Sequence, residues 1–217
     1  MSDETARFNM IESQLRPNGI IDERVLAAFA RIRREEFAPA GLRAAAYIDE
    51  DLPLGGGRAM MEPRVVARLL QAAAPQRTEI ALVVGAGSGY EAAVTAMLAK
   101  SVTALEEDLD LARRARAGLV EHGIAAVEVV EGPLCEGWRS HAPYDVILFG
   151  GAIAEVPAAI KGQLADDGRL VAVVKGADGL GRAVLMTRAG GTFGQRSLFD
   201  AAVPLLPGFA AKPQFVF

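Results

Sequence analysis

Short apolar runs alternate with amphipathic stretches from residue 80 onward, and this alternation constrains the fold more than any other feature of the chain. The runs are short, β-branched and nearly continuous in apolar character, as is typical of strands covered on both faces. They lie at Ile80–Val84, Val102–Leu105, Val127–Val130, Asp145–Phe149, Arg169–Val174 and Ala183–Thr187. The stretches between them predict helices at Tyr90–Ala99, Leu109–His122 and Val156–Leu164. This strand–helix–strand repetition predicts a parallel α/β sheet with right-handed crossovers.

The first 75 residues have a different, helical character. Asp22 can cap a helix whose apolar stripe consists of Val25, Leu26, Phe29 and Ile32. A glycine- and proline-rich loop at residues 53–57 then leads to a second helix that starts at Pro63, a favourable first position. Because no linker separates the two parts, we expect residues 1–75 to be a helical extension packed on an α/β core of residues 76–217, within one domain of residues 1–217.

The tail from Pro204 to Phe217 carries three prolines and ends in Phe215-Val216-Phe217. Apolar side chains at a chain end gain stability when they leave water. We therefore expect the tail to pack against the core, as an edge strand.

Composition excludes several classes of protein. The 217 residues carry a net charge of −4, with a pI near 5.3, which argues against binding to nucleic acid or to an anionic membrane. No apolar run reaches the ~18 residues of a membrane span, and the acidic start is not a secretory signal. The single Cys135 excludes an internal disulfide and a multi-cysteine metal site. We expect a soluble, cytoplasmic protein whose oligomeric state stays open.

The sharpest motif is Gly85-Ala86-Gly87-Ser88-Gly89-Tyr90, between the first predicted strand and its helix. Glycines there let the backbone turn tightly and approach a ligand, and a helix N-terminus offers free N–H groups. A dinucleotide fingerprint needs Gly or Ala where Tyr90 stands. The spacing G-x-G-x-G is instead the form found in methyltransferases that bind S-adenosylmethionine. The alternative is a purely structural βα turn.

Glu106 ends the second predicted strand, 21 residues after Gly85. An acid at this place can accept hydrogen bonds from both ribose hydroxyls of an adenosyl cofactor. Glu107 and Asp108 follow it, so the alternative is a charge favoured by the N-terminus of the next helix. We favour the ribose role for Glu106 and the helix role for its neighbours.

Further stretches resemble the protein-L-isoaspartate O-methyltransferase family, in collinear order over about residues 8–190. They are Gln14–Arg16, Asp22–Leu26, Arg34–Pro39, Tyr47–Gly57 with Pro63, Gly137–Ile147, Glu155–Pro157 and Gln163–Val171. The resemblance implies S-adenosylmethionine as cofactor and a peptide or protein carboxylate as acceptor, namely the α-carboxyl of isoaspartyl residues in damaged proteins, which such enzymes methylate in protein repair. It also implies a Rossmann-like, seven-stranded methyltransferase sheet with one antiparallel strand and helices on both faces.

The chain departs from the family pattern in the acceptor loop. The family resemblance leads us to expect Gly-Gln-Thr-Ile-Ser-x-Pro at residues 57–63, with the two hydroxyls at the methyl-acceptor site. Here Arg58 replaces the glutamine, and Ala59 and Met61 replace the hydroxyl residues. We predict Arg58 and Met61 at the catalytic side of the site, with Arg58 as a bidentate clamp on the acceptor carboxylate. The alternative for Arg58 is a solvated loop residue.

The cofactor side departs as well. Val83 stands where the family has an acid, and Pro133 stands where the family has an aspartate that contacts adenine. Loss of one such hydrogen bond costs about 1–3 kcal/mol. The resemblance still predicts that the three loop glycines shape the methionine end of the pocket, that Glu106 holds the ribose, and that the adenine is bordered by Gly132 and Leu134.

Three functions therefore remain open. The leading one is an S-adenosylmethionine-dependent O-methyltransferase acting on isoaspartyl residues. The second is a non-catalytic relative that senses a cofactor or binds a partner, and the third is a methyltransferase with another acceptor. We expect no metal site, because His122 is placed to interact with the end of a helix and His141 to be structural. Arg31, Arg33 and Arg34 predict a solvated, salt-bridged helix end.

Overall fold

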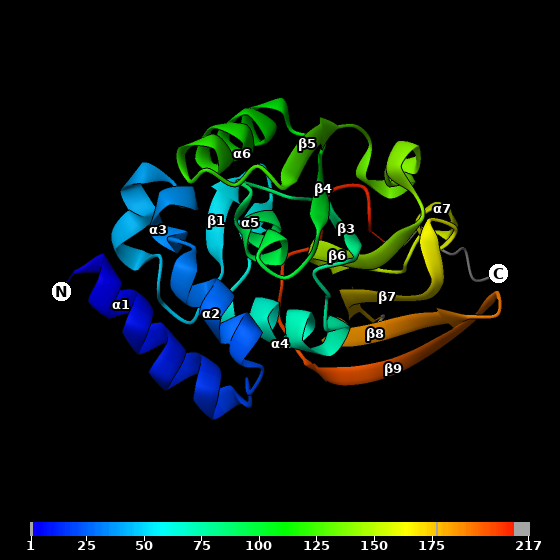
Figure 1. Cartoon of the computed structure of the whole chain (residues 1–217), viewed down its shortest axis with the longest axis horizontal. Helices are drawn as coiled ribbons and strands as arrows, with labels where there is room; N and C mark the ends of the chain where they lie inside the picture. The colour runs from blue at the N-terminus through cyan, green and yellow to red at the C-terminus, as the bar shows by residue number, and fades with distance from the viewer. Residues whose placement is uncertain (1, 177, 211–217) are drawn as a thin grey trace.

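A seven-stranded sheet forms the centre of the molecule (Figure 1). The computed structural model describes residues 2–176 and 178–210. The strands of the sheet are β3 Ile80–Val84, β4 Ser101–Glu106, β5 Val127–Glu131, β6 Tyr144–Ile153, β7 Leu164–Lys175, β8 Gly181–Ala189 and β9 Thr192–Asp200. All six predicted strands are present. β9 was missed because most of its residues are exposed, so it lacks the apolar signal of a buried strand.

The strands are ordered β5-β4-β3-β6-β7-β8-β9 across the sheet. β3 pairs in parallel with both β4 and β6, whereas β8 runs antiparallel to β7 and to β9. β8 is thus the one reversed strand of this sheet, as the family resemblance implied. From β3 the chain builds outward first to β4 and β5, and then returns to β6 on the other side. In open α/β sheets, ligands bind outside the carboxyl ends of the strands at such a switch point.

Helices cover both faces of the sheet, as predicted. They are α1 Asp3–Met10, α2 Glu23–Arg31, α3 Arg34–Phe37, α4 Pro63–Ala73, α5 Tyr90–Ala96, α6 Leu109–Glu121 and α7 Ala158–Lys161. The face that carries Val83 and Leu148 shares one apolar cluster with α2, α4, α5 and α6. The opposite face, with Leu82 and Ile147, is covered by α7 and by residues 206–209. α7 is much shorter than predicted, because it begins only after Pro157 and already ends before Gly162.

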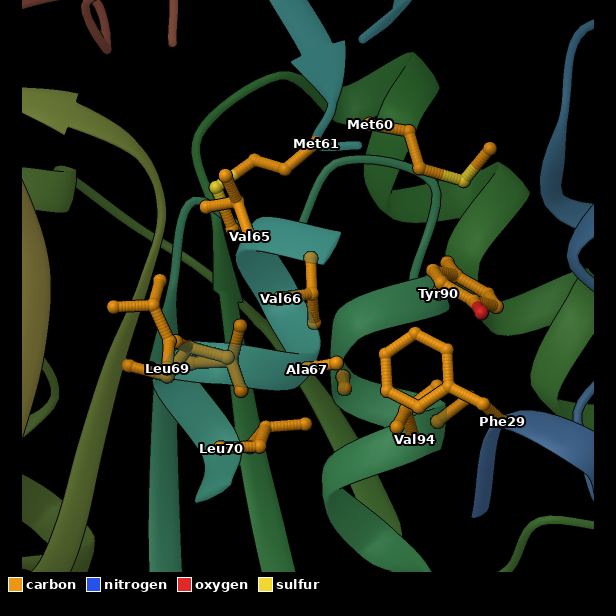
Figure 2. Close-up of a cluster of buried hydrophobic side chains, with 14 of the residues drawn as sticks. Phe29, Met60, Met61, Val65, Val66, Ala67, Leu69, Leu70, Tyr90 and Val94 are labelled. Atoms are coloured by element: carbon orange, nitrogen blue, oxygen red, sulfur yellow. The ribbon is translucent and has the colours of Figure 1, made fainter. Parts of the chain in front are cut away.

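The N-terminal part is helical as predicted, and it also contains a short hairpin formed by β1 Leu52–Gly55 and β2 Arg58–Met60. α2 starts after Asp22, whose side chain accepts a hydrogen bond from the N–H of Arg24. The ring of Phe29 meets the edge of Tyr90 in α5, with 6.2 Å between the centroids. Figure 2 shows both rings in the same cluster as the side chains of α4. The extension therefore shares its apolar core with the sheet.

After β9 the chain returns across β6 near its carboxyl end. The N–H of Ala152 donates to the oxygen of Pro204 at 2.9 Å, and the N–H of Leu206 donates back to the oxygen of Ala152 at 2.8 Å. The tail is thus packed as predicted as far as it is described, but β9 and not the tail forms the edge of the sheet. Residues Phe215–Phe217 lie outside the described part of the chain.

Candidate functional site

The glycine loop follows β3 at the switch point of the sheet. The N–H groups of Gly85 and Ala86 donate to the oxygen of Leu105 at 2.9 and 3.0 Å, which ties the loop to the end of β4. Gly85 and Gly87 have φ values of 76° and 57°, a region that L side chains rarely adopt. Gly89 lies against α6, since a Cβ on Gly89 would lie 3.1 Å from the Cβ of Ala115. A contact of Gly89 with a cofactor stays a prediction.

Glu106 is the last residue of β4 and is fully buried beside this loop. Its Oε2 accepts the N–H of Gly87 at 2.7 Å, and its Oε1 accepts the N–H groups of Glu107 and Asp108 at 3.0 and 3.1 Å. The cap of α6 is Asp108, whose side chain accepts two N–H groups of the first turn. Glu106 thus faces the glycine loop rather than capping the helix, and the helix role belongs to its neighbour Asp108.

Arg58 completes the surroundings of Glu106. Its Nη1 lies 2.5 Å from Oε1 of Glu106, and the side chains of the pair are 2% and 0% exposed. Its Nε and Nη2 are buried without a hydrogen-bond partner. Nη2 lies against the glycine loop, 3.0 Å from the position of a Cβ on Gly85. The expectation of a solvated loop residue is therefore wrong, because the β1–β2 hairpin directs Arg58 into the protein.

Two leucines close the same region from opposite sides. A Cβ on Gly87 would lie 2.9 Å from Leu54 of the hairpin. A Cβ on Gly85 would lie 2.9 Å from Leu206, and one on Gly151 would lie 2.7 Å from the same side chain. Leu206 is therefore wedged between the glycine loop and β6. Neither leucine was predicted at the site, since nothing local in the sequence marks a residue that packs on glycines far away in the chain.

A buried polar network, formed by Arg34 of α3 and Glu91 of α5, anchors the C-terminal end of the hairpin. The N–H of Met61 donates to Oε1 of Glu91 at 3.0 Å, while Arg34 donates from Nε to Ala46 and from Nη2 to the carbonyl oxygen of Met60. Desolvation by burial raises the pKa of Glu91 to about 7, although Arg34 opposes the shift. Arg34 itself is fully buried, so the prediction of a solvated position is wrong for this arginine.

Met61 was predicted at the acceptor side of the site. The structure places its side chain in the apolar core, 0% exposed. Figure 2 shows Met60 and Met61 pointing away from each other, with Met61 beside Val65 of α4. Contact of Met61 with an acceptor stays a prediction, and the observed role of this residue is to anchor the hairpin.

The predicted adenine border lies at the end of β5. The N–H of Gly132 donates to the carbonyl oxygen of Glu106 at 3.2 Å, so this turn lies next to the backbone at the end of β4. A Cβ on Gly132 would come within 3.3 Å of the ring of Trp138, and Leu134 is 1% exposed. Contact of Gly132 and Leu134 with adenine stays a prediction.

The remaining candidates lie elsewhere. His122 stacks on Phe37, and its Nε2 lies 2.7 Å from a carboxylate oxygen of Glu36. Nδ1 of His141 lies 3.1 Å from the hydroxyl of Thr103, and Cys135 is exposed. Within residues 2–176 and 178–210, no three His, Cys, Asp or Glu side chains are grouped as metal ligands. Over the same residues, no helix combines the length and the apolar character that a membrane span needs.

A cleft of about 680 Å³ adjoins the C-terminal segment. Its charged lining residues are Asp51, Glu62, Arg64, Lys175 and Asp200. The cleft reaches Pro204, whose carbonyl oxygen accepts the N–H of Ala152. Two residues further on, the N–H of Leu206 donates to the carbonyl oxygen of Ala152. The C-terminal segment therefore borders this cleft and also supplies the leucine that packs on the glycine loop. Burial raises the pKa of both Asp51 and Glu62.

Comparison with protein families decides the assignment. The model of the family Protein-L-isoaspartate(D-aspartate) O-methyltransferase matches residues 6–202. The chain belongs to this family. The family is one of S-adenosylmethionine-dependent methyltransferases. Contact of the glycine loop and Glu106 with that cofactor stays a prediction.

Relatives and solved structures agree with this assignment. A protein-L-isoaspartate O-methyltransferase of Methylorubrum populi is 41% identical over 96% of this chain and 98% of its own length, and one of Koribacter versatilis is 40% identical over 95% and 93%. A solved protein-L-isoaspartate O-methyltransferase gives a TM-score of 0.81 at 22% identity, over 95% of this chain and 66% of its own. A structure from Plasmodium falciparum, assigned to the same enzyme class and in complex with S-adenosyl-L-homocysteine, gives 0.80 at 19% identity, over 95% and 98%. At this identity the two structures support the fold alone.

Proposed function

We propose that this protein is an S-adenosylmethionine-dependent O-methyltransferase that methylates a carboxylate of a protein acceptor, with isoaspartyl residues as the acceptor class. One observation carries the proposal. The chain matches its family over residues 6–202, and within that match a glycine loop and a buried carboxylate meet at the switch point of the sheet. The match includes every residue predicted to hold the cofactor.

The residues at this edge are of the chemical types that would bind S-adenosylmethionine. Gly85 and Gly87 present backbone without side chains, and Glu106 presents a carboxylate that suits two ribose hydroxyls. The space itself is taken by side chains of the same chain, because Arg58 occupies Oε1 of Glu106 and Leu206 lies on Gly85. A cofactor therefore needs these two side chains to move, and over Gly87 it also meets Leu54.

The reaction asks little acid–base chemistry of the protein. A bound S-adenosylmethionine supplies an electrophilic methyl group on a sulfonium. A carboxylate acceptor is already ionised at neutral pH, so no general base is needed. In the transfer a new O–CH₃ bond forms, the S–CH₃ bond breaks and its electron pair stays on the sulfur. The protein has to align the reactants and exclude water, effects worth up to about 7–11 kcal/mol in favourable cases.

Two features support an acceptor with a carboxylate. The unpaired Nε and Nη2 of Arg58 offer the planar donor edge that binds a carboxylate in two places. The neighbouring cleft is about 680 Å³ in volume, enough for a segment of peptide, and its charged lining mixes Arg64 and Lys175 with Asp51, Glu62 and Asp200. We assign this cleft to the acceptor and Arg58 to its carboxylate.

Turnover of an isoaspartyl peptide with methyl-labelled S-adenosylmethionine tests the proposal, with the normal aspartyl peptide as control. The expected result is a base-labile methyl ester on the isoaspartyl peptide only. No ester beside an active family member assayed in parallel would exclude the repair activity. The side chains that fill the cofactor edge, Arg58 and Leu206, favour the second candidate, a non-catalytic relative, which would bind the cofactor or a partner without turnover of any carboxylate.

A further inference from the structure

The side chains that fill the cofactor edge come from two segments on opposite sides of the sheet. Arg58 comes from the hairpin at the face of α4 and α5, and Leu206 comes from the C-terminal segment on the opposite face. Both lie within about 3 Å of the position of a Cβ on Gly85. The two segments thus meet over one glycine, at the switch point where a ligand of this sheet is expected.

Oε1 of Glu106 has no acceptor position left for a ribose hydroxyl. A carboxylate offers about four lone-pair sites. In Glu106 three donors meet Oε1, namely Nη1 of Arg58 and the N–H groups of Glu107 and Asp108, whereas Oε2 accepts the N–H of Gly87. A ribose that uses both carboxylate oxygens therefore needs one donor to leave Oε1. The three N–H groups belong to the backbone of the loop and of the following turn. Arg58 is the one partner that can leave without a change in the backbone around Glu106.

The closed arrangement also leaves polar groups unsatisfied. Nε and Nη2 of Arg58 are buried and have no partner, and a buried unpaired donor is costly. Movement of Arg58 toward solvent would let water bind these donors. The residue directly follows three exposed glycines with positive φ, Gly55 to Gly57, at the tip of the hairpin. The Leu206 segment lies outside the seven strands and is held to β6 by the two hydrogen bonds of Ala152, so the Leu206 side chain can move without unpairing the strands of the sheet.

We propose that Arg58 and Leu206 form an internal closure that competes with S-adenosylmethionine for Glu106 and for the space over Gly85. The proposal rests on the proposed function, because it takes this edge to be the cofactor site. Binding of the cofactor then requires Arg58 to release Glu106, and the released guanidinium is free to take the acceptor carboxylate. The closure therefore makes cofactor binding precede acceptor binding.

The experiment is a calorimetric titration of the full chain with S-adenosyl-L-homocysteine and with S-adenosylmethionine. The variants are Arg58→Gln, Arg58→Lys, Leu206→Ala and the double variant Arg58→Gln with Leu206→Ala. Arg116→Gln is the matched control for the arginine, because Arg116 also lies 2.5 Å from a glutamate but at the surface. Leu119→Ala is the control for the leucine, being equally buried in α6 at 3% exposure. Leu206→Val serves if the alanine variant fails to fold.

A second readout comes from Trp138, the one tryptophan of the sequence. Its ring lies beside Gly132, next to Glu106, so its fluorescence reports on a ligand at this edge independently of heat. If the closure competes, Arg58→Gln and Leu206→Ala each bind S-adenosyl-L-homocysteine at least about tenfold more tightly than the wild type. Arg58→Lys falls between, and the two controls match the wild type.

Two other outcomes overturn the closure and separate it from the proposed function. Tight binding by the wild type, weakened by Arg58→Gln, would make Arg58 a direct ligand of the cofactor and leave the methyltransferase intact. Absence of binding by every folded variant at millimolar ligand would overturn both the closure and the cofactor-dependent function.

Discussion

Two neighbouring strands end in a glutamate that is paired with an arginine, and the two pairs differ mainly in their exposure to water. Glu106 of β4 and Glu131 of β5 are register partners. Each has an arginine nitrogen at 2.5 Å, from Arg58 and from Arg116 respectively. The side chains of the first pair are 2% and 0% exposed, and those of the second 43% and 39%. The same contact distance therefore occurs in two dielectric settings.

Exposure decides what each pair does. An exposed ion pair contributes about 0–1 kcal/mol, since water competes for both charges. A buried pair roughly balances its desolvation cost, but loss of one partner costs about 3–5 kcal/mol because the other charge stays buried. Arg116 comes from α6 and also binds the carbonyl oxygen of Val129, so its pair links two adjacent elements. Arg58 joins the N-terminal hairpin to β4, and a cofactor for Glu106 has to break that link.

The largest expected effect comes from removing the two glutamates. Glu106→Ala leaves Arg58 buried without a counter-charge and removes the acceptor of three backbone N–H groups. We expect it to lower the free energy of unfolding by about 3–5 kcal/mol. Glu131→Ala leaves a solvated arginine and should cost less than about 1 kcal/mol. Urea unfolding followed by circular dichroism measures both values.

Equal losses in the two alanine variants would show that burial does not distinguish the pairs. Glu106→Gln serves as a further check, since its amide oxygen can still accept backbone N–H groups. It should lie between the wild type and Glu106→Ala.

The part of this comparison that is local in sequence could be predicted. The glycine loop and Glu106 follow directly from strand ends, and a strand end can be recognised from a short apolar run. The strand–helix alternation predicted the parallel sheet, and the single reversed strand followed from the family resemblance, whereas the strand order that places the loop at the switch point came from the structure. The capping role of Asp108 is also local, because its side chain binds the N–H groups of residues two and three positions further along the chain.

The closure could not be predicted in the same way. Arg58 lies 48 residues from Glu106 in sequence, and a charged residue after a glycine turn ordinarily favours solvent. Only the docking of the hairpin on the sheet buries it. Leu206 belongs to a proline-flanked tail without a periodic pattern, so its contact with Gly85 depends on the path of the whole segment. β9 was missed for a related reason, because an exposed edge strand shows no apolar run.

A third glutamate, Glu91, sharpens the comparison because it is buried without a paired arginine. Desolvation raises its pKa to about 7, from an ordinary value of 4.5. Between pH 4.5 and 7 the unfolded chain has released this proton while the folded chain still holds it, so stability falls as pH rises through this window. Glu91→Gln removes the titration, and its amide oxygen can still accept the N–H of Met61.

We expect the stability of Glu91→Gln relative to the wild type to increase by about 2 kcal/mol between pH 5 and pH 7.5. Urea unfolding of both proteins at the two pH values measures this change. A difference that is the same at both pH values would show that burial does not hold the proton on Glu91. Glu91→Ala, which also removes the acceptor for Met61, is the control for loss of the hydrogen bond itself.

The smallest expected effect is the change with salt in the stability cost of removing each arginine. This change distinguishes the exposed Arg116 from the buried Arg58. At 1 M salt the Debye length falls to about 3 Å, so charges in water are screened while charges inside the protein are not. Arg116→Ala should cost less than about 1 kcal/mol at low salt, and this cost should disappear in 1 M NaCl. The cost of Arg58→Ala should be the same at both salt concentrations. Urea is the right denaturant for this test, because it carries no charge and leaves the ionic strength free to vary. A salt-dependent cost at Arg58 would mean that water reaches Glu106 in solution, and that the cofactor edge is already open.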